Sequence, residues 1–313
     1  MQALHGRPIA EWQGVDRASF ERDIAPGQQP AVLRGLVTSW PVVQQALAGD
    51  AAVCRYLAGL DNGSDVDALM VPSGLNGRIF YADDWVGFNY LRNRLPLSRV
   101  IEQLMRYSRY PDPPAVAVQS ARACDCAPAF GRAHPMPLLD AGVAPRLWLG
   151  NAITTPTHFD ESSNIACVAA GERRFTLFPP EQVRHLYIGP IGHAPTGTPI
   201  SLVDLDAPDL ARYPLFAQAL ETAQSALLGP GDAIYIPPLW WHQVASRRPV
   251  NLLVNYWWQP PDVPSGLDAL LQARLAFGAF PAVQRRAWQA LLAHWVFEAD
   301  EHTVAHIPPA WRS

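Results

Sequence analysis

The chain has nine histidines, and only His158 has a carboxylate two residues further on, in the segment His158-Phe159-Asp160. Residues i and i+2 of a β-strand point to the same face, so this spacing would bring an imidazole nitrogen and a carboxylate oxygen to one point. His242, which follows a Pro- and Trp-rich segment and begins another strand-like run, is the natural third ligand. Two histidines and one carboxylate bind one face of Fe(II) and leave positions open for O2 and a chelating substrate.

The same residues have purely structural interpretations. A His-x-Asp segment is common in proteins, and a histidine that follows aromatic residues is more often packed in a core. Cys124 and Cys126 also have metal-ligand spacing, but no second close cysteine pair completes a four-ligand site. The segments around His158 and His242 therefore decide between a metal site and ordinary packing.

Short apolar runs separated by Gly- and Pro-containing turns surround these histidines. Such runs are typical of strands in a β-sandwich, jelly roll or barrel. A helical insert is expected at about 208–220, where the spacing of apolar residues changes. The strand-like runs are residues 146–150, 164–170, 173–178, 233–236 and 250–258.

The flanking regions differ from this β-rich centre. Residues 18–24 and 97–107 have helical spacing, and 30–34 is strand-like. Beyond the centre, two apolar helices are expected between 265 and 297, divided at Pro281. The sequence thus predicts a mainly β fold with a jelly-roll core at 115–262. A mixed α/β region at 1–114 would support it, and helices would follow at 263–313.

Four separated motifs occur in order between residues 146 and 258. They are Thr155-Pro-Thr-His-Phe-Asp160 with Asn164, Gly171-Glu-Arg-Arg-Phe-Thr-Leu-Phe-Pro-Pro180, Gly229-Pro-Gly-Asp-Ala-Ile-Tyr-Ile-Pro-Pro-Leu-Trp-Trp-His242 and Val254-Asn-Tyr-Trp257. Together they resemble the motifs of the cupin-like JmjC oxygenases. Their order and spacing are similar to those of the family's asparaginyl hydroxylase that inhibits hypoxia-inducible factor. The resemblance implies a double-stranded β-helix and an Fe(II)- and 2-oxoglutarate-dependent oxygenase.

The resemblance also implies roles for single residues. His158, Asp160 and His242 would hold the iron. Thr155 would help to hold the distal carboxylate of 2-oxoglutarate, and Asn164 and Asn255 would lie beside the cosubstrate and the iron. Asn255 lies in an otherwise apolar strand, where a buried amide needs hydrogen-bond partners. A bound carboxylate or metal water would supply them, and the neighbouring backbone is the alternative.

Two departures from the family pattern bear on the cosubstrate. The chain contains no lysine, and Arg173 stands where the family often has a lysine that pairs with the distal carboxylate. Arginine can make the same pair through two parallel hydrogen bonds; Arg174 would point to the opposite face of the strand. A tyrosine that contacts this carboxylate in the asparaginyl hydroxylase is absent from residues 115–120, where Gln119 is a candidate replacement.

Composition restricts the partners and the compartment. The net charge is −4 and no basic run is present, which disfavours a nucleic-acid surface. No apolar stretch reaches membrane-spanning length and no signal peptide is recognisable, so a cytoplasmic protein with free thiols is expected. The apolar helices after residue 263 predict a homodimer, with packing onto residues 1–110 as the alternative.

The predicted activity is hydroxylation of a protein side chain or a small molecule, with Fe(II), 2-oxoglutarate and O2. Two alternatives stay open at this point. One is a metal-dependent cupin enzyme that does not use 2-oxoglutarate, although such sites usually have more histidine ligands. The other is a non-catalytic jelly-roll binding module, which the intact triad argues against.

Overall fold

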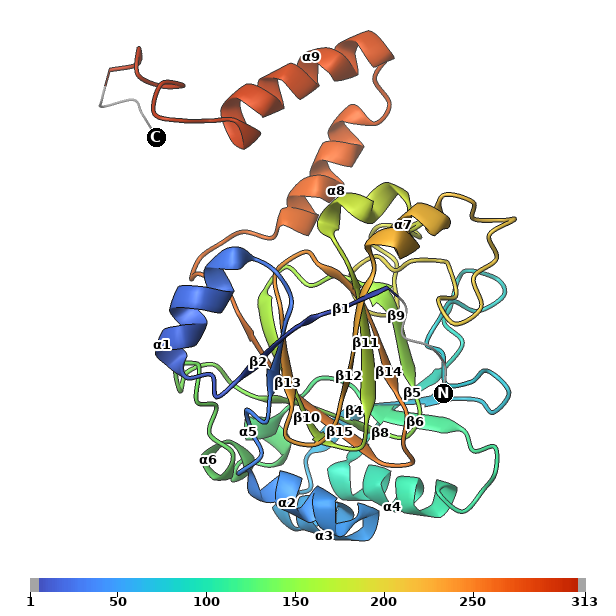
Figure 1. Cartoon of the computed structure of the whole chain (residues 1–313). Helices are drawn as coiled ribbons and strands as arrows, with labels where there is room; N and C mark the ends of the chain where they lie inside the picture. The colour runs from blue at the N-terminus through green and yellow to red at the C-terminus, as the bar shows by residue number, and fades with distance from the viewer. Residues whose placement is uncertain (1–5, 309–313) are drawn as a thin grey trace. The chain divides into compact units, whose positions relative to one another are not determined.

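Two β-sheets face each other in the first of the two units into which the chain divides, Met1–Pro261 and Asp262–Ser313. The computed structural model describes residues 6–308 (Figure 1). The smaller sheet has the order β1-β12-β11-β14-β9. Its strands are β1 (Arg7–Pro8), β9 (Thr154–His158), β11 (Arg173–Phe178), β12 (Gln224–Leu228) and β14 (Trp241–Ser246).

The larger sheet has ten strands in the order β2-β3-β13-β10-β15-β8-β6-β4-β5, with β7 paired to β8. It joins strands from the first 114 residues to strands of the predicted core, because β4 pairs with β6 and β3 with β13. Its strands are β2 (Ala10–Gln13), β3 (Ala31–Arg34), β4 (Asp65–Val71), β5 (Leu91–Pro96), β6 (Ala115–Val118), β7 (Ala121–Arg122), β8 (Arg146–Gly150), β10 (Ser163–Ala170), β13 (Ala233–Ile236) and β15 (Asn251–Trp258).

The space between the sheets is filled by alternate residues of the central strands. Phe175 and Leu177 of β11 face Ala166 and Val168 of β10 in one apolar cluster. Alternation follows from the two-residue period of a strand, which sends every second side chain inward. The predicted mainly β, jelly-roll fold is confirmed, and the five predicted strand runs are observed with ends shifted by at most one residue.

Helices cover the outer face of the larger sheet, as the blue and cyan ribbons of Figure 1 show. The predicted helix at 97–107 is α4 (Leu97–Tyr107), which buries Leu97, Val100, Ile101 and Leu104 at the three- and four-residue spacing of one helical face. The other elements on this side are α1 (Arg17–Ser19), η1 (Phe20–Ile24), η2 (Ala25–Gly27), α2 (Pro41–Ala48), α3 (Asp50–Leu60), α5 (Ala123–Cys126) and α6 (Phe130–Ala133).

The insert between β11 and β12 forms η3 (Pro180–Arg184) and the helix α7 (Phe216–Thr222). This helix begins later than the expected position near 208, because the preceding residues form turns. The Asp209 carboxylate accepts hydrogen bonds from the main-chain nitrogens of Ala211 and Arg212 and so holds a turn there. Phe216 of α7 packs against Trp241 and other residues on the outer face of the smaller sheet.

The N-terminal segment joins both sheets. β1 pairs in parallel with β12 of the smaller sheet, and β2 pairs in parallel with β3 of the larger one. Ile9, between them, is only 2% exposed and belongs to the inter-sheet core. Gly6 precedes this crossing with φ +79, and a Cβ atom there would lie 1.9 Å from the Ala223 carbonyl oxygen, so a side chain is excluded.

The second unit contains α8 (Gly266–Phe277), α9 (Ala282–Leu292) and the π-helical turn η4 (Ala293–Phe297). Pro281 is the N-cap of α9, so the predicted division of the helices at this proline is confirmed. None of the residues in these three elements is buried, and several large apolar side chains are exposed on them. These side chains are Leu270, Leu275, Val283, Trp288, Leu291, Trp295, Val296 and Phe297.

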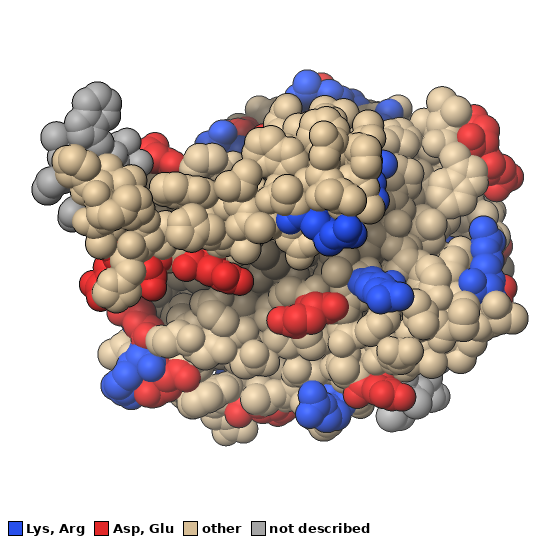
Figure 2. Space-filling view, turned by 90° about the horizontal axis from the view of Figure 1, so that it is seen from above, with Lys and Arg blue, Asp and Glu red and all other residues tan. Residues whose placement is uncertain are grey.

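Charged side chains are sparse and mixed on the face shown in Figure 2, where basic and acidic residues alternate among uncharged ones. This distribution agrees with the small net charge of −4. Among the described residues, the helices fall short of the length and apolarity that crossing a lipid bilayer demands.

Candidate metal and cosubstrate site

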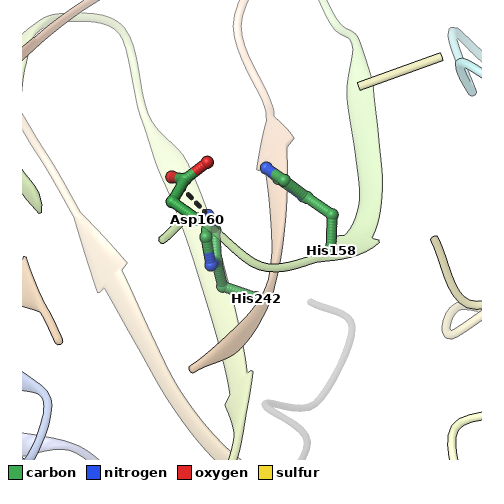
Figure 3. A group of neighbouring side chains, drawn as sticks. All are labelled: His158, Asp160 and His242. Carbon is green, nitrogen blue, oxygen red and sulfur yellow. Dashed lines mark ion pairs between the residues drawn. The ribbon is translucent and has the colours of Figure 1, made fainter. Parts of the chain in front are cut away.

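The three predicted metal ligands lie together at one end of the sandwich (Figure 3). His158 is the last residue of β9, and its strand partner in the antiparallel pair is His242 of β14. One ligand atom from each of His158, Asp160 and His242 lies within 4.8 Å of the others. Within residues 6–308 this is the one group of three or more His, Cys, Asp or Glu side chains so placed.

Asp160 reaches the group in a different way from the one expected. β9 ends at His158, so the two residues are not alternate positions of one strand. Beyond the strand, the Asp160 carbonyl accepts a hydrogen bond of 2.8 Å from the main-chain nitrogen of Leu239. The loop before β14 therefore holds the backbone of Asp160, whose side chain remains 21% exposed.

Both histidines use Nδ1 for a backbone hydrogen bond and leave Nε2 for the centre of the group. The Nδ1 of His158 donates to the Pro156 carbonyl at 2.8 Å, and the Nδ1 of His242 donates to the Trp240 carbonyl at 2.9 Å. A carbonyl only accepts, so each Nδ1 carries a proton, and in the neutral form of each ring the lone pair lies on Nε2. Burial and the neighbouring His242 lower the pKa of His158 to about 4, which keeps that ring neutral at physiological pH.

The predicted asparagines form a polar chain that ends at the Asp160 carboxylate. Trp148 donates from Nε1 to the Asn255 Oδ1 at 2.7 Å. Asn255 in turn donates to the Asn164 Oδ1 at 3.4 Å, and Asn164 donates to the Asp160 Oδ2 at 3.5 Å. The buried amide of Asn255 is thus bonded to side chains, not to the neighbouring backbone that the sequence left as an alternative.

Arg173 points into the same interior from β11 on the smaller sheet. Its side chain is buried, and its Nη2 donates to the Trp148 carbonyl at 3.1 Å. Its Nε has no hydrogen-bond partner, and no described carboxylate forms an ion pair with it. Burial lowers the pKa of Arg173 to about 9, so the side chain still carries its charge at neutral pH.

Arg174 is excluded from this interior. It points to the other face of β11, as the strand alternation predicted, and forms an ion pair with Asp206 there. The two neighbouring arginines therefore have separate environments, and only Arg173 faces the triad.

One pocket contains all seven residues predicted for the site, with about 430 Å³ of empty volume. Its remaining walls are mostly apolar, as is typical of small-ligand sites with a few placed polar groups. The predicted lining residues are Thr155, His158, Asp160, Asn164, Arg173, His242 and Asn255, and the others are Trp148, Ala166, Phe175, Ile236, Val244, Leu253 and Trp257.

A wider groove opens outward from this pocket and shares Trp148, Trp257 and two triad residues with it. Gln119 lines the groove and not the inner pocket, so it does not replace the missing tyrosine beside Arg173. The Trp148 carbonyl is the group that contacts the guanidinium instead. The position of Gln119, next to the strand end of β6, directs its side chain to the outer opening.

Comparison with known proteins agrees with this architecture. The cupin-like domain family matches residues 17–263, which is most of the chain. A human protein named bifunctional peptidase and (3S)-lysyl hydroxylase JMJD7 is 27% identical over 272 residues, covering 76% of this chain and 80% of its own length. An Arabidopsis thaliana protein named lysine-specific demethylase JMJ31 is 35% identical over 133 residues, 41% of this chain.

The extent of these matches differs. The chain covers only 24% of the length of the plant demethylase. The human tRNA wybutosine-synthesizing protein 5 is 36% identical over 103 residues, which make up 33% of this chain and 30% of that protein. The matched residues include every strand from β3 to β15, which together form most of both sheets. They also include His158, Asp160 and His242. The chain belongs to the cupin-like domain family, among relatives named as hydroxylases and demethylases.

Proposed function

We propose that this chain is an Fe(II)- and 2-oxoglutarate-dependent oxygenase that hydroxylates a protein side chain or a small molecule. The observation that carries the proposal is the pairing of two features in one pocket. A buried guanidinium without an acidic partner faces a group of two histidines and one carboxylate. A buried unpaired charge destabilises a protein by several kcal/mol, so a site that keeps one is suited to an anionic ligand.

The donor set fits Fe(II). Two neutral imidazole nitrogens and one carboxylate form a facial ligand set that leaves coordination positions open. When bound together with 2-oxoglutarate and O2, iron would supply the oxidising power for C–H hydroxylation, with succinate and CO2 as coproducts. The chain's own part is to hold these groups in position and to keep water out.

The opposite wall fits the far end of 2-oxoglutarate. Arg173 offers a free Nε–H, and Thr155 lines the same pocket with a hydroxyl group. Both would hold the distal carboxylate by charge-assisted hydrogen bonds. Phe175, Val244 and Leu253 provide apolar walls between the two polar ends, which suits the methylene carbons of a short dicarboxylate.

The names of two relatives support a reaction that oxidises a C–H bond, but they do not identify the substrate of this chain. The human relative named as a lysyl hydroxylase is matched over 80% of its length, and the plant relative named as a demethylase over 24%. Removal of an N-methyl group also begins with hydroxylation of a carbon, so both names are compatible with the same site. The outer groove is where a substrate side chain would reach the triad.

The test is release of succinate from 2-oxoglutarate by protein loaded with Fe(II) in the absence of oxygen and then exposed to air. Succinate should form with Fe(II) and O2 and should be lost in Asp160→Ala. Binding of 2-oxoglutarate without turnover under any metal would favour a binding module. Metal binding without any affinity for 2-oxoglutarate would favour a different cupin enzyme. Mass spectrometry of cell extract incubated with the active enzyme would then identify the hydroxylated substrate.

A further inference from the structure

We infer that Trp257 is a positioning residue for the metal-binding carboxylate, a role that rests on the proposed metal site. Its indole Nε1 donates to the Asp160 Oδ2 at 3.1 Å. The carboxylate is the one member of the triad that no strand holds, because β9 ends at His158. Its side chain is also more exposed than those of the two histidines, at 21%. The position of the Asp160 side chain therefore depends on the hydrogen bonds that its carboxylate accepts.

The strand pairing places Trp257 where it can act. Trp257 lies opposite Asn164 in the antiparallel pair of β15 and β10, two residues after Asn255. Residues two apart in a strand share a face, so Trp257 and Asn255 both point to the pocket. The indole donor and the amide of Asn164 thus approach the same carboxylate oxygen from paired positions.

Of these two donors, Trp257 makes the stronger contact. The Asn164 amide lies 3.5 Å from the Asp160 Oδ2, at the outer limit for a hydrogen bond, whereas the indole nitrogen lies at 3.1 Å. The indole is itself held in place by its neighbours. The Trp148 and Trp257 rings pack edge to face, with 6.0 Å between their centroids. The guanidinium carbon of Arg146 lies 5.4 Å from the centroid of the Trp257 ring.

The hydrogen bond leaves the carboxylate able to bind a metal. An ionised carboxylate has two oxygens with about four lone-pair positions, and the indole uses one of them. The same Oδ2 lies 3.6 Å from the His242 Nε2, so the bond holds the carboxylate beside a histidine ligand. Without the indole N–H, only the 3.5 Å contact from the Asn164 amide would hold this oxygen in place. Hydrogen bonds of this kind to metal-ligating groups typically change metal affinity by about 10- to 100-fold.

The experiment measures Co(II) binding by visible absorption, which reports both affinity and ligand geometry without turnover. Trp257→Phe should raise the Kd for Co(II) by about 10- to 100-fold and change the d–d absorption bands. Trp257→Leu, which also lacks a donor but has a different shape, should do the same. Circular dichroism and thermal unfolding of the metal-free variants establish that they are folded, and the second variant serves if the first is not.

Trp241→Phe is the matched control. Trp241 is adjacent to His242, packs on the Phe159 ring and donates from its indole to the Pro180 carbonyl instead of to Asp160. This variant should keep the Co(II) affinity and spectrum of the wild type. Unchanged affinity and spectrum in both Trp257 variants, or an equal loss in Trp241→Phe, would overturn the role of Trp257. Failure of the wild type to bind Co(II) would instead remove the metal site itself.

Discussion

The guanidinium of Arg173 lies 3.1 Å from the main-chain carbonyl oxygen of Trp148, across the space between the two sheets. The two residues belong to β11 of the smaller sheet and β8 of the larger sheet. This single neutral acceptor does not balance a buried positive charge. The arrangement therefore keeps a cation ready for an anionic ligand at a cost to the stability of the ligand-free protein.

Replacement of Arg173 by methionine should separate the contribution of this cation to ligand binding from its cost to the stability of the ligand-free protein. Methionine has a similar length and no charge, so the ligand-free Arg173→Met protein should unfold at a higher temperature than the wild type. Its binding free energy for 2-oxoglutarate should be less favourable by about 1.5–3 kcal/mol, the range for hydrogen bonds to charged groups. Differential scanning calorimetry and isothermal titration with metal-loaded protein would measure the two changes.

Arg173→Lys provides the matched control for charge. It should retain part of the affinity, because it keeps the cation but loses the paired donors of the guanidinium. Arg174→Ala tests the strand face: it breaks the ion pair with Asp206 and should leave affinity for 2-oxoglutarate unchanged. If Arg174→Ala loses the affinity and Arg173→Met keeps it, the assignment of the anion site is wrong.

Each triad residue should be needed for stoichiometric Fe(II) binding. His158→Ala, Asp160→Ala and His242→Ala each remove one of three donors that lie within 4.8 Å of one another, so two ligands remain for the metal. Metal analysis after anaerobic loading and desalting should show occupancy near zero in all three variants. His185→Ala is the control, since His185 pairs with Gln182 outside the site. Full occupancy in the triad variants would refute the assignment.

Stability should fall at acidic pH through His134, which is 1% exposed. Its Nδ1 donates to the Phe130 carbonyl at 2.7 Å, and its Nε2 accepts from the main-chain nitrogen of Val42 at 3.2 Å. Burial lowers the pKa of His134 below the ordinary value of 6.5. As the pH falls, His134 is therefore protonated in the unfolded chain before it is protonated in the folded protein. Its contribution to the free energy of unfolding is present above pH 6.5 and decreases as the pH falls below 6.5.

Urea unfolding of the wild type and His134→Asn across this pH range would test the effect. The substitution should lower the free energy of unfolding by about 1–3 kcal/mol at neutral pH, because it removes the acceptor of the Val42 main-chain N–H and one of two donors to the Phe130 carbonyl. The difference between the two proteins should shrink as the pH falls. A difference that stays constant with pH would show that His134 does not titrate in this way. His302→Ala, at an exposed position, is the control.

We propose that the second unit mediates a homodimer. Its helices expose large apolar side chains, among them Leu275 and Phe297 at 77% and 79% exposure. Such a surface is unfavourable in water and is usually covered by a partner. Light scattering should give a dimer mass for the wild type and a monomer mass for the double variant Leu292→Arg with Trp295→Arg, with metal binding retained.

Leu47→Arg is the control for this experiment, because Leu47 is 62% exposed on α2 of the first unit. This variant should keep the mass of the wild type. A wild-type monomer at micromolar concentration would reject the dimer, and a dimer that survives the double substitution would place the interface elsewhere.

Much of the fold could be predicted because its signals are local. The apolar runs of the central strands, the turns between them and the spacing of Leu97 to Leu104 are all encoded in adjacent residues. The order of the motifs around His158 and His242 then indicated which side chains share the site, whereas the pairing of the strands was not predicted. The later start of α7 was missed because Pro208 and Asp209 favour turns that the apolar spacing of the insert concealed.

The sequence did not predict that Trp148 and Trp257 line the pocket. Trp148 and Trp257 lie in strands that were predicted, but the face that each presents was not assigned. The position of Trp257, two residues after Asn255, is a signal that would have placed it in the pocket. Its hydrogen bond to Asp160 joins residues 97 positions apart, and only the register of β15 against β10 determines that contact.

The N-terminal segment pairs with both sheets and therefore limits where the chain can be truncated. A fragment cut to the limits of the family match would begin at residue 17 and lack β1 and β2. Removal of these strands would leave β12 and β3 with bare edges and would uncover the hydrophobic space that Ile9 fills. Bare edges recruit strands from other molecules, so such a fragment should aggregate on expression although every proposed active-site residue is still present.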